Sequence, residues 1–186
     1  MLLWVAAMAV AAAATARAGE DVTVPARVQA QLLVAVASFQ SNMNLAADGS
    51  VQILVVIKDD DAASERVARQ LVGALGDMKR IARHPHHEVV EPFHDAASLA
   101  ATCRERHISL VYLSTGLGAA VPEVAQALQG TAVLTAGAVA GFVQRGTALG
   151  FDLVSGRSEM LLNRTQVKAL NVQFPPTLFQ LMRVVE

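Results

Sequence analysis

Apolar residues along this chain follow two alternating patterns, one typical of strands and one typical of helices. Residues 51–57 and 108–113 are nearly continuous apolar runs rich in branched side chains, as in strands that are covered on both faces. Between them, apolar residues recur at a four-residue spacing over residues 67–75, which predicts a helix with one apolar face. Asp61 precedes this helix and is a residue type favoured as an N-cap. Together these segments predict a strand–helix–strand unit.

The same alternation continues through most of the chain. Further helices are predicted at residues 95–106, 121–128 and 139–143, and further strands at residues 88–93, 131–135, 148–154 and 159–163. A first helix is predicted from Pro25 to residues 42–44. Its apolar face, expected to pack on the core, is formed by Val28, Leu32, Val36 and Phe39. A last helix, after Pro175–Pro176, is expected to bury Leu178, Leu181, Met182 and Val185.

These elements predict an α/β fold formed by a single domain over residues 19–186. Strands that alternate with helices favour a three-layer sandwich, with a mainly parallel sheet and helices on both faces. Strand 88–93 is expected near an edge because Pro92 cannot donate a hydrogen bond to a neighbouring strand. The paired strands 148–154 and 159–163 are expected to add an antiparallel edge.

The amino-terminal residues have the pattern of a signal peptide. An apolar, Ala-rich run covers residues 2–15 and ends in Ala16-Arg17-Ala18, the small-x-small form that signal peptidase cleaves. The run is shorter than the roughly 20 residues that a membrane-spanning helix needs. No Lys or Arg precedes it, so the amino terminus alone would carry the positive charge. We therefore expect residues 1–18 to be cleaved and the domain to be periplasmic.

Composition excludes one function class and limits the cysteine chemistry. The formal net charge is -1 and no Lys- or Arg-rich run occurs, which argues against nucleic-acid binding. The single cysteine, Cys103, cannot form an internal disulfide. Its spacing from Leu99 favours a buried apolar role, with a reactive or intermolecular thiol as the alternative.

Polar residues follow two of the predicted core strands at their carboxyl ends. In open α/β sheets this edge is where small ligands bind. The ligand-binding candidates are Asp59, Asp61, Ser114, Thr115 and Gly116. The loop that contains Ser114, Thr115 and Gly116 lacks the full phosphate-loop and dinucleotide fingerprints, so a plain strand-to-helix turn is the simpler interpretation. The three consecutive carboxylates at residues 59–61 could hold a cation, but the later ligands of a calcium loop are missing.

No other motif predicts catalysis, a metal or a cofactor. The stretch His84-Pro85-His86-His87 matches no zinc spacing and is expected to be an exposed loop. The nucleophile-elbow, Ser-x-x-Lys and His-Glu-x-x-His patterns are absent from the sequence. We therefore expect a binding protein rather than an enzyme.

The carboxyl-terminal half carries an ordered series of short motifs. These are Val133-Leu134-Thr135, Gly141-Phe142, Arg145-Gly146, Phe151-Asp152-Leu153-Val154, Glu159-Met160-Leu161-Leu162-Asn163 and Leu178-Phe179-Gln180-Leu181-Met182. In their order and spacing they resemble the YfiR/HmsC-like family, and the resemblance covers most of the chain after residue 18. The motif positions that carry over are Phe142, Gly146, Asn163 and Leu181, all expected to be structural.

The resemblance implies a function that the residues alone do not. It implies a periplasmic regulator that docks on the sensor region of an inner-membrane signalling protein, such as a diguanylate cyclase or sensor kinase, and restrains it. Two copies could also pair with each other. The chain departs from the family at Thr147, at Pro175–Pro176 and in lacking paired cysteines, which puts disulfide-based control in doubt. The alternative function is a periplasmic small-ligand-binding protein associated with an uptake system.

Overall fold

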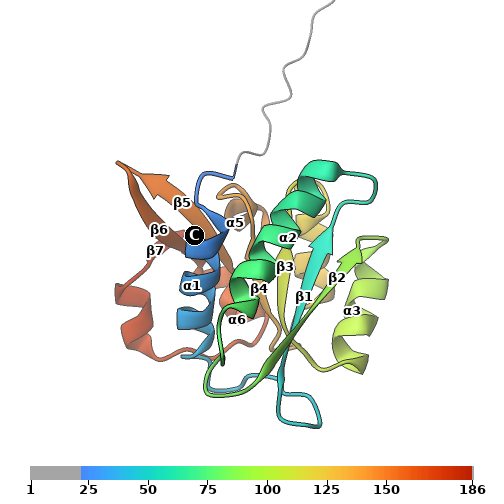
Figure 1. Cartoon of the computed structure of the whole chain (residues 1–186). Coiled ribbons are helices and arrows are strands. Elements are labelled where there is room, and N and C mark those ends of the chain that lie inside the picture. The colour runs from blue at the N-terminus through green and yellow to red at the C-terminus, as the bar shows by residue number, and fades with distance from the viewer. Residues whose placement is uncertain (1–21, 186) are drawn as a thin grey trace, which may run out of the picture.

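The structure, a computed structural model, describes residues 22–185 and is built on one seven-stranded sheet (Figure 1). The strand order is β2-β1-β3-β4-β5-β6-β7. The strands are β1 Val51–Ile57, β2 His86–Pro92, β3 Ile108–Leu113, β4 Leu134–Gly137, β5 Leu149–Val154, β6 Arg157–Asn163 and β7 Arg183–Val185. The helices are α1 Ala26–Ala37, α2 Ala62–Gly76, α3 Ala96–Glu105, α4 Val121–Ala127, α5 Phe142–Arg145 and α6 Arg164–Ala169, followed by a 3-10 turn, η1 Pro176–Gln180.

The sheet is mostly parallel, as the sequence predicts. Strand β1 is parallel to both β2 and β3, and the ladder continues in parallel through β4 to β5. Strands β5 and β6 form the one antiparallel pair of the described sheet. The outermost strand, β7, runs parallel to β6. The predicted α/β fold class is therefore confirmed, and the antiparallel pair lies one strand in from the edge.

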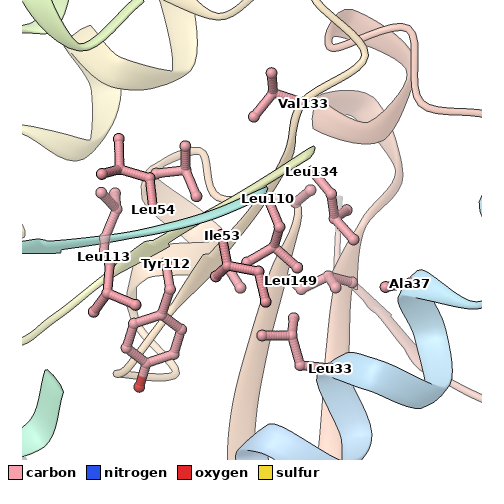
Figure 2. Close-up of a cluster of buried hydrophobic side chains, with 14 of the residues drawn as sticks. Leu33, Ala37, Ile53, Leu54, Leu110, Tyr112, Leu113, Val133, Leu134 and Leu149 are labelled. Carbon is pink, nitrogen blue, oxygen red and sulfur yellow. The ribbon is translucent and has the colours of Figure 1, made fainter. Parts of the chain in front are cut away.

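Helices cover both faces of the sheet. Helices α1 and α2 pack together on one face, and α3 and α4 pack together on the other (Figure 1). This division follows from right-handed crossovers, because the chain moves outward from β1 to β2 and then back across the sheet to β3. On the first face, Leu33 of α1 lies over Ile53 and Leu110, all of them buried (Figure 2).

The predicted centre of the sheet and the predicted cap at Asp61 are confirmed. Strands β1 and β3 lie side by side and are buried over most of their length. The Asp61 carboxylate accepts hydrogen bonds from two amides at the start of α2, and the Asp95 carboxylate does the same for one amide of α3. Strand β2 is an edge strand, as the position of Pro92 predicts.

The first helix is shorter than predicted. Helix α1 ends at Ala37, and Phe39 is 48% exposed instead of facing the core. The helix ends because the chain after it pairs with the segment after α6, where the Ser41 amide donates to the Gln173 carbonyl at 3.0 Å. A long-range pairing of this kind leaves no trace in the local apolar pattern. Strand β4 also begins at Leu134 rather than at Thr131.

The predicted last helix is wrong. Residues 176–180 form only the 3-10 turn η1, and the chain then extends into β7, which pairs with β6. Leu178 is 3% exposed, but Leu181 is 78% exposed. The backbone groups of this segment can form hydrogen bonds either within a helix or with the free edge of β6. The helical spacing of the four apolar residues does not show that the second alternative is available. Helix α6 was not predicted either.

Close packing holds α5 against the sheet. Gly137 of β4 lies under Phe142, where an added Cβ would stand 2.6 Å from the Phe142 Cβ. Gly150 of β5 lies under Val143 in the same way, where the added Cβ would stand 2.3 Å from a valine methyl. Both contacts are closer than a side chain permits, so these two positions need glycine.

Candidate functional site

The predicted candidate residues lie where the strand order reverses. The chain leaves β1 in one direction to form β2 and returns on the other side to form β3, so the loops after β1 and β3 diverge. In open α/β sheets this point, at the carboxyl ends of the strands, is where ligands bind. Asp61 follows β1, and Ser114 and Gly116 follow β3.

Hydrogen bonds tie these two loops together. The Ser114 hydroxyl donates to the Ser64 carbonyl at 2.7 Å, and the Ser64 hydroxyl accepts from the Lys58 amide at 2.9 Å. Gly116 has a φ of +80° and approaches both Lys58 and Asp61, so that a Cβ there would lie 2.7 Å from a Lys58 methylene. The structure therefore brings Asp61, Ser114 and Gly116 together at one edge.

Asp61 already has its own partners at this edge. Its carboxylate accepts from the Ala63 amide at 3.0 Å and the Ser64 amide at 2.9 Å, and it lies 3.7 Å from the Lys58 ammonium. The Ser64 amide is the largest cause that lowers the pKa of Asp61 below its ordinary 3.8. An anion would have to compete with this carboxylate for the start of α2.

Two other predicted residues at this edge differ in exposure. Asp59 is exposed to solvent. Thr115 is buried, and its hydroxyl has no hydrogen-bond partner among the described residues. A buried hydroxyl without a hydrogen-bond partner costs free energy, so a ligand that bonds to the Thr115 hydroxyl would remove that cost.

A larger surface feature lies at the other side of the molecule, and the sequence analysis missed it. A groove of about 740 Å³ opens between the end of α1, the outer face of α6 and η1. We call it the aromatic groove. It is lined by Phe39, Ser41, Arg164, Val167, Lys168, Val172, Gln173, Phe174, Pro175 and Phe179.

The floor of the aromatic groove is fixed by hydrogen bonds between two segments that are distant in the sequence. The Asn42 side chain donates to the Asn171 carbonyl at 2.7 Å and accepts from the Gln173 amide at 2.9 Å. The Ser41 amide donates to the Gln173 carbonyl alongside them. The segments after α1 and α6 are thereby joined much as two strands are, and the groove is formed without any partner.

The walls of the groove combine aromatic rings with positive charge. Three of the six phenylalanines of the chain line it. The Arg164 guanidinium lies 5.7 Å from the centre of the Phe179 ring, a cation–π arrangement. Lys168 follows one helical turn later on α6, and no Asp or Glu is among the lining residues. Such a surface can bind an apolar group that carries negative charge.

The remaining titratable candidates have structural partners. The buried His86 ring lies between the Glu88 carboxylate and the Met78 carbonyl, with 2.8 Å between Nε2 and the latter. His84 Nδ1 lies 3.0 Å from the Gly49 carbonyl. Burial raises the pKa of the Cys103 thiol from 9.0 to about 12. Within residues 22–185, no group of three or more acidic, His or Cys side chains is placed to hold a metal ion.

Comparison with known protein families decides where this chain belongs. The YfiR/HmsC-like family model matches residues 26–183, from the first residue of α1 to the first of β7. The chain belongs to the YfiR/HmsC-like family. The sequence resemblance is thereby confirmed. No protein in a search of curated sequences matched this YfiR/HmsC-like chain.

Three solved structures share the fold of this YfiR/HmsC-like protein at low sequence identity. The ABC domain in complex with L-Trp from Streptococcus pneumonia matches with a TM-score of 0.58 and 11% identity, over 87% of this chain and 62% of that one. A conserved domain protein from Vibrio cholerae matches at 0.55 and 15%, over 87% and 60%. A ligand-free, open substrate-binding protein with adhesive properties from Clostridium difficile matches at 0.57 and 14%, over 84% and 58%. This chain thus spans about three fifths of each of them.

Three of the four positions that the sequence resemblance singles out gather around α5 and α6. Phe142 is buried over Gly137, and Gly146 ends α5 with a φ of +126°. Asn163 caps α6 by accepting from the Gln166 amide at 2.8 Å, and its amide donates to the Val143 carbonyl at 2.9 Å. Leu181, the fourth position, lies between η1 and β7 and is exposed on the surface.

The predicted signal peptide, residues 1–18, lies outside the described part of the chain. Over residues 22–185, no helix has both the length and the apolar character needed to cross a bilayer.

Proposed function

We propose that this YfiR/HmsC-like protein is a periplasmic regulator that binds the sensor region of an inner-membrane signalling protein and restrains it, without catalysis of its own. The signalling protein is a diguanylate cyclase or a sensor kinase. Membership of the family supports this function. Export follows from the predicted signal peptide at residues 1–18.

The observation that carries the proposal is the aromatic groove. It presents Phe39 at 48% exposure together with the partly exposed rings of Phe174 and Phe179, and the Arg164 guanidinium lies over the Phe179 ring. Aromatic and Arg side chains dominate the binding energy of protein interfaces, because they bury a large area and still form directed polar contacts. Exposed aromatic clusters of this kind are expected at docking surfaces rather than on inert ones.

A second candidate function, small-ligand binding for an uptake system, has its own supporting observations. The fold resembles that of a solved substrate-binding protein and that of an ABC domain solved in complex with L-Trp, although the low identity supports the fold alone. Asp59, Asp61, Ser114, Thr115 and Gly116 follow the strands that flank the reversal of strand order, and the Thr115 hydroxyl lacks a partner. In this alternative a small polar ligand would bind at that edge.

A pull-down from detergent-solubilised membranes of the source organism tests the proposal. The mature chain, residues 19–186, is immobilised, and retained proteins are identified by mass spectrometry. We expect a cyclase or kinase with a periplasmic sensor region to be retained. Adding the mature chain to that purified protein should then lower its cyclase or kinase activity. Retention of transport components alone would contradict the regulatory function and favour the second candidate.

A further inference from the structure

We infer that the aromatic groove receives a short acidic, apolar segment of the partner protein, and that Arg164 and Lys168 select this segment by its carboxylates. This inference rests on the proposed function and adds to it the site of docking and the chemistry of the partner. Its occupant is part of a protein chain, and its contacts are both apolar and charged.

Charge is the first argument. The groove contributes two positive side chains and no negative one, whereas the chain as a whole has a formal net charge of -1. Neither Arg164 nor Lys168 has a carboxylate partner within residues 22–185. Arg69, Arg106 and Arg183, by contrast, lie in ion pairs with acidic side chains. The two groove cations therefore offer charge that no acidic side chain within residues 22–185 neutralises.

The position of Arg164 is the second argument. Its guanidinium stacks over the Phe179 ring, which restrains a side chain that would otherwise sample many rotamers. A guanidinium held by one face still presents its N–H groups at the edge, where a carboxylate can accept two of them. Lys168 lies at the (i, i+4) position on the same side of α6 and can contact a second acidic group.

The apolar part of the groove is the third argument. Phe39 follows α1, whereas Phe174 and Phe179 lie in the segment after α6, and the three rings line one hollow. Its volume of about 740 Å³ lies within the range of roughly 300–1,000 Å³ that is typical of sites for compact ligands. It suits a few side chains of a short segment and is too small to seat a folded domain.

The fixed floor of the groove is the fourth argument. Because Asn42 and Ser41 hold residues 171–173 in place, the groove exists before the partner arrives. A preformed site loses little conformational entropy on binding, so more of the contact energy appears as affinity. The entropic cost then falls mainly on the partner segment.

Charge reversal tests the inference directly. The double variant Arg164→Glu/Lys168→Glu is compared with the natural chain in the membrane pull-down. The matched control is Arg66→Glu/Lys79→Glu, which makes the same change in net charge at exposed residues outside the groove. We expect the groove variant to lose about tenfold or more of the retained signalling protein, and the control to retain it. Retention by the natural chain should also fall as salt is raised.

Photo-crosslinking identifies the segment. The substitution Phe39→p-benzoylphenylalanine keeps an aromatic group in the groove, and Val90→p-benzoylphenylalanine places the same group on the exposed part of the distant edge strand β2. We expect the first to crosslink to a partner segment that contains Asp or Glu beside apolar residues. We expect the second to give no crosslink to that segment.

The outcomes distinguish a failure of the inference from a failure of the proposed function. If the natural chain and both charge variants retain the signalling protein equally, the regulator stands and the inference is wrong. If the natural chain retains no signalling protein, both fail. A third result would also overturn the inference: dodecanoate raises the melting temperature of the natural chain but not of the Arg164→Glu/Lys168→Glu chain, while partner retention is the same for both. The groove would then bind a small anionic amphiphile.

Discussion

The Tyr112 hydroxyl donates a hydrogen bond to the side-chain carbonyl of Gln29 at 2.7 Å, and both residues are fully buried. The Gln29 amide donates in turn to the Val24 carbonyl at 2.8 Å and lies 3.4 Å from the Ala138 carbonyl. One polar side chain thus joins α1 to the central strand β3 and to the loop after β4. The apolar layer between α1 and the sheet is positioned by this small network.

Removing the Tyr112 hydroxyl should destabilise the fold. In Tyr112→Phe the Gln29 carbonyl loses its donor in a dry environment, which costs about 1–3 kcal/mol. The measurement is urea unfolding followed by circular dichroism, with an expected lower midpoint. The double variant Tyr112→Phe/Gln29→Leu is the control for coupling, because it removes both partners and should cost less than the sum of the single changes. Strict additivity of the two changes would contradict the network.

Adding a methyl group at Gly150 should also destabilise the fold, because the new Cβ would overlap a Val143 methyl. We expect Gly150→Ala to cost about 1–3 kcal/mol. A second change, Val143→Ala, removes the clashing methyl and should recover part of that loss. The matched control is Gly73→Ala in α2, where an added Cβ meets nothing within 4 Å and should stabilise the helix by about 0.5–1 kcal/mol. Equal effects at the two glycines would contradict the packing of α5.

Asp61 should contribute to stability as a helix cap, whether or not it also binds a ligand. Replacing it in Asp61→Ala should cost about 1 kcal/mol, whereas Asp59→Asn, at an exposed neighbour, should change little. Because the pKa of Asp61 is lowered below 3.8 in the folded state, its contribution is present above that pH. It is lost as the pH falls through the lowered value. Unfolding midpoints measured between pH 7 and pH 2 should therefore converge for the two variants.

The Cys103 thiol should react slowly in the folded protein. Burial raises its pKa to about 12, so almost no thiolate exists at pH 8. We expect a chromogenic disulfide reagent to react quickly only after denaturation. Since the unfolded thiol ionises near 9.0, stability should fall as the pH rises from about 9 toward 12, and less so in Cys103→Ala. Rapid labelling of the native protein would contradict this burial.

Leu178 and Leu181 form a matched pair that tests the carboxyl-terminal segment. The first is 3% exposed and the second 78% exposed. Truncation in Leu178→Ala should cost about 2–5 kcal/mol, and Leu181→Ala should change stability by less than about 0.5 kcal/mol. A helix with one apolar face, as the sequence pattern predicts, would make the two costs similar. Thermal unfolding of both variants distinguishes the two structures.

The sequence predicts the parts of this fold whose stabilising contacts are local or repeat with a regular period. Strands β1 and β3, helix α2 and its Asp61 cap are of this kind, because their burial on the sheet imposes a pattern on consecutive residues. The carboxyl-terminal helix is predicted wrongly because β7 forms on an edge that is supplied by β6, and that partner cannot be read from residues 178–185.

The two candidate sites differ in the same way. The edge at Asp61 and Ser114 is predictable, because the carboxyl ends of adjacent parallel strands must meet. The aromatic groove is not, because its rings come from residues 39, 174 and 179 and are brought together by hydrogen bonds between distant segments. The signals in the sequence were an aromatic residue at the end of a helix and the pair Phe174-Pro175, and neither predicts a shared hollow by itself.

The turn between β5 and β6 bears on how the chain reaches this structure. Ser155 and Gly156 both have positive φ, as a two-residue hairpin turn requires, so Val154 and Arg157 pair without a long loop. The parallel ladders of the described sheet join strands that are far apart in the sequence, and closing such loops is entropically costly and slow. A hairpin can form in about 1–10 μs. The β5–β6 hairpin can therefore form before the parallel part of the sheet assembles, which makes it a natural nucleus for folding.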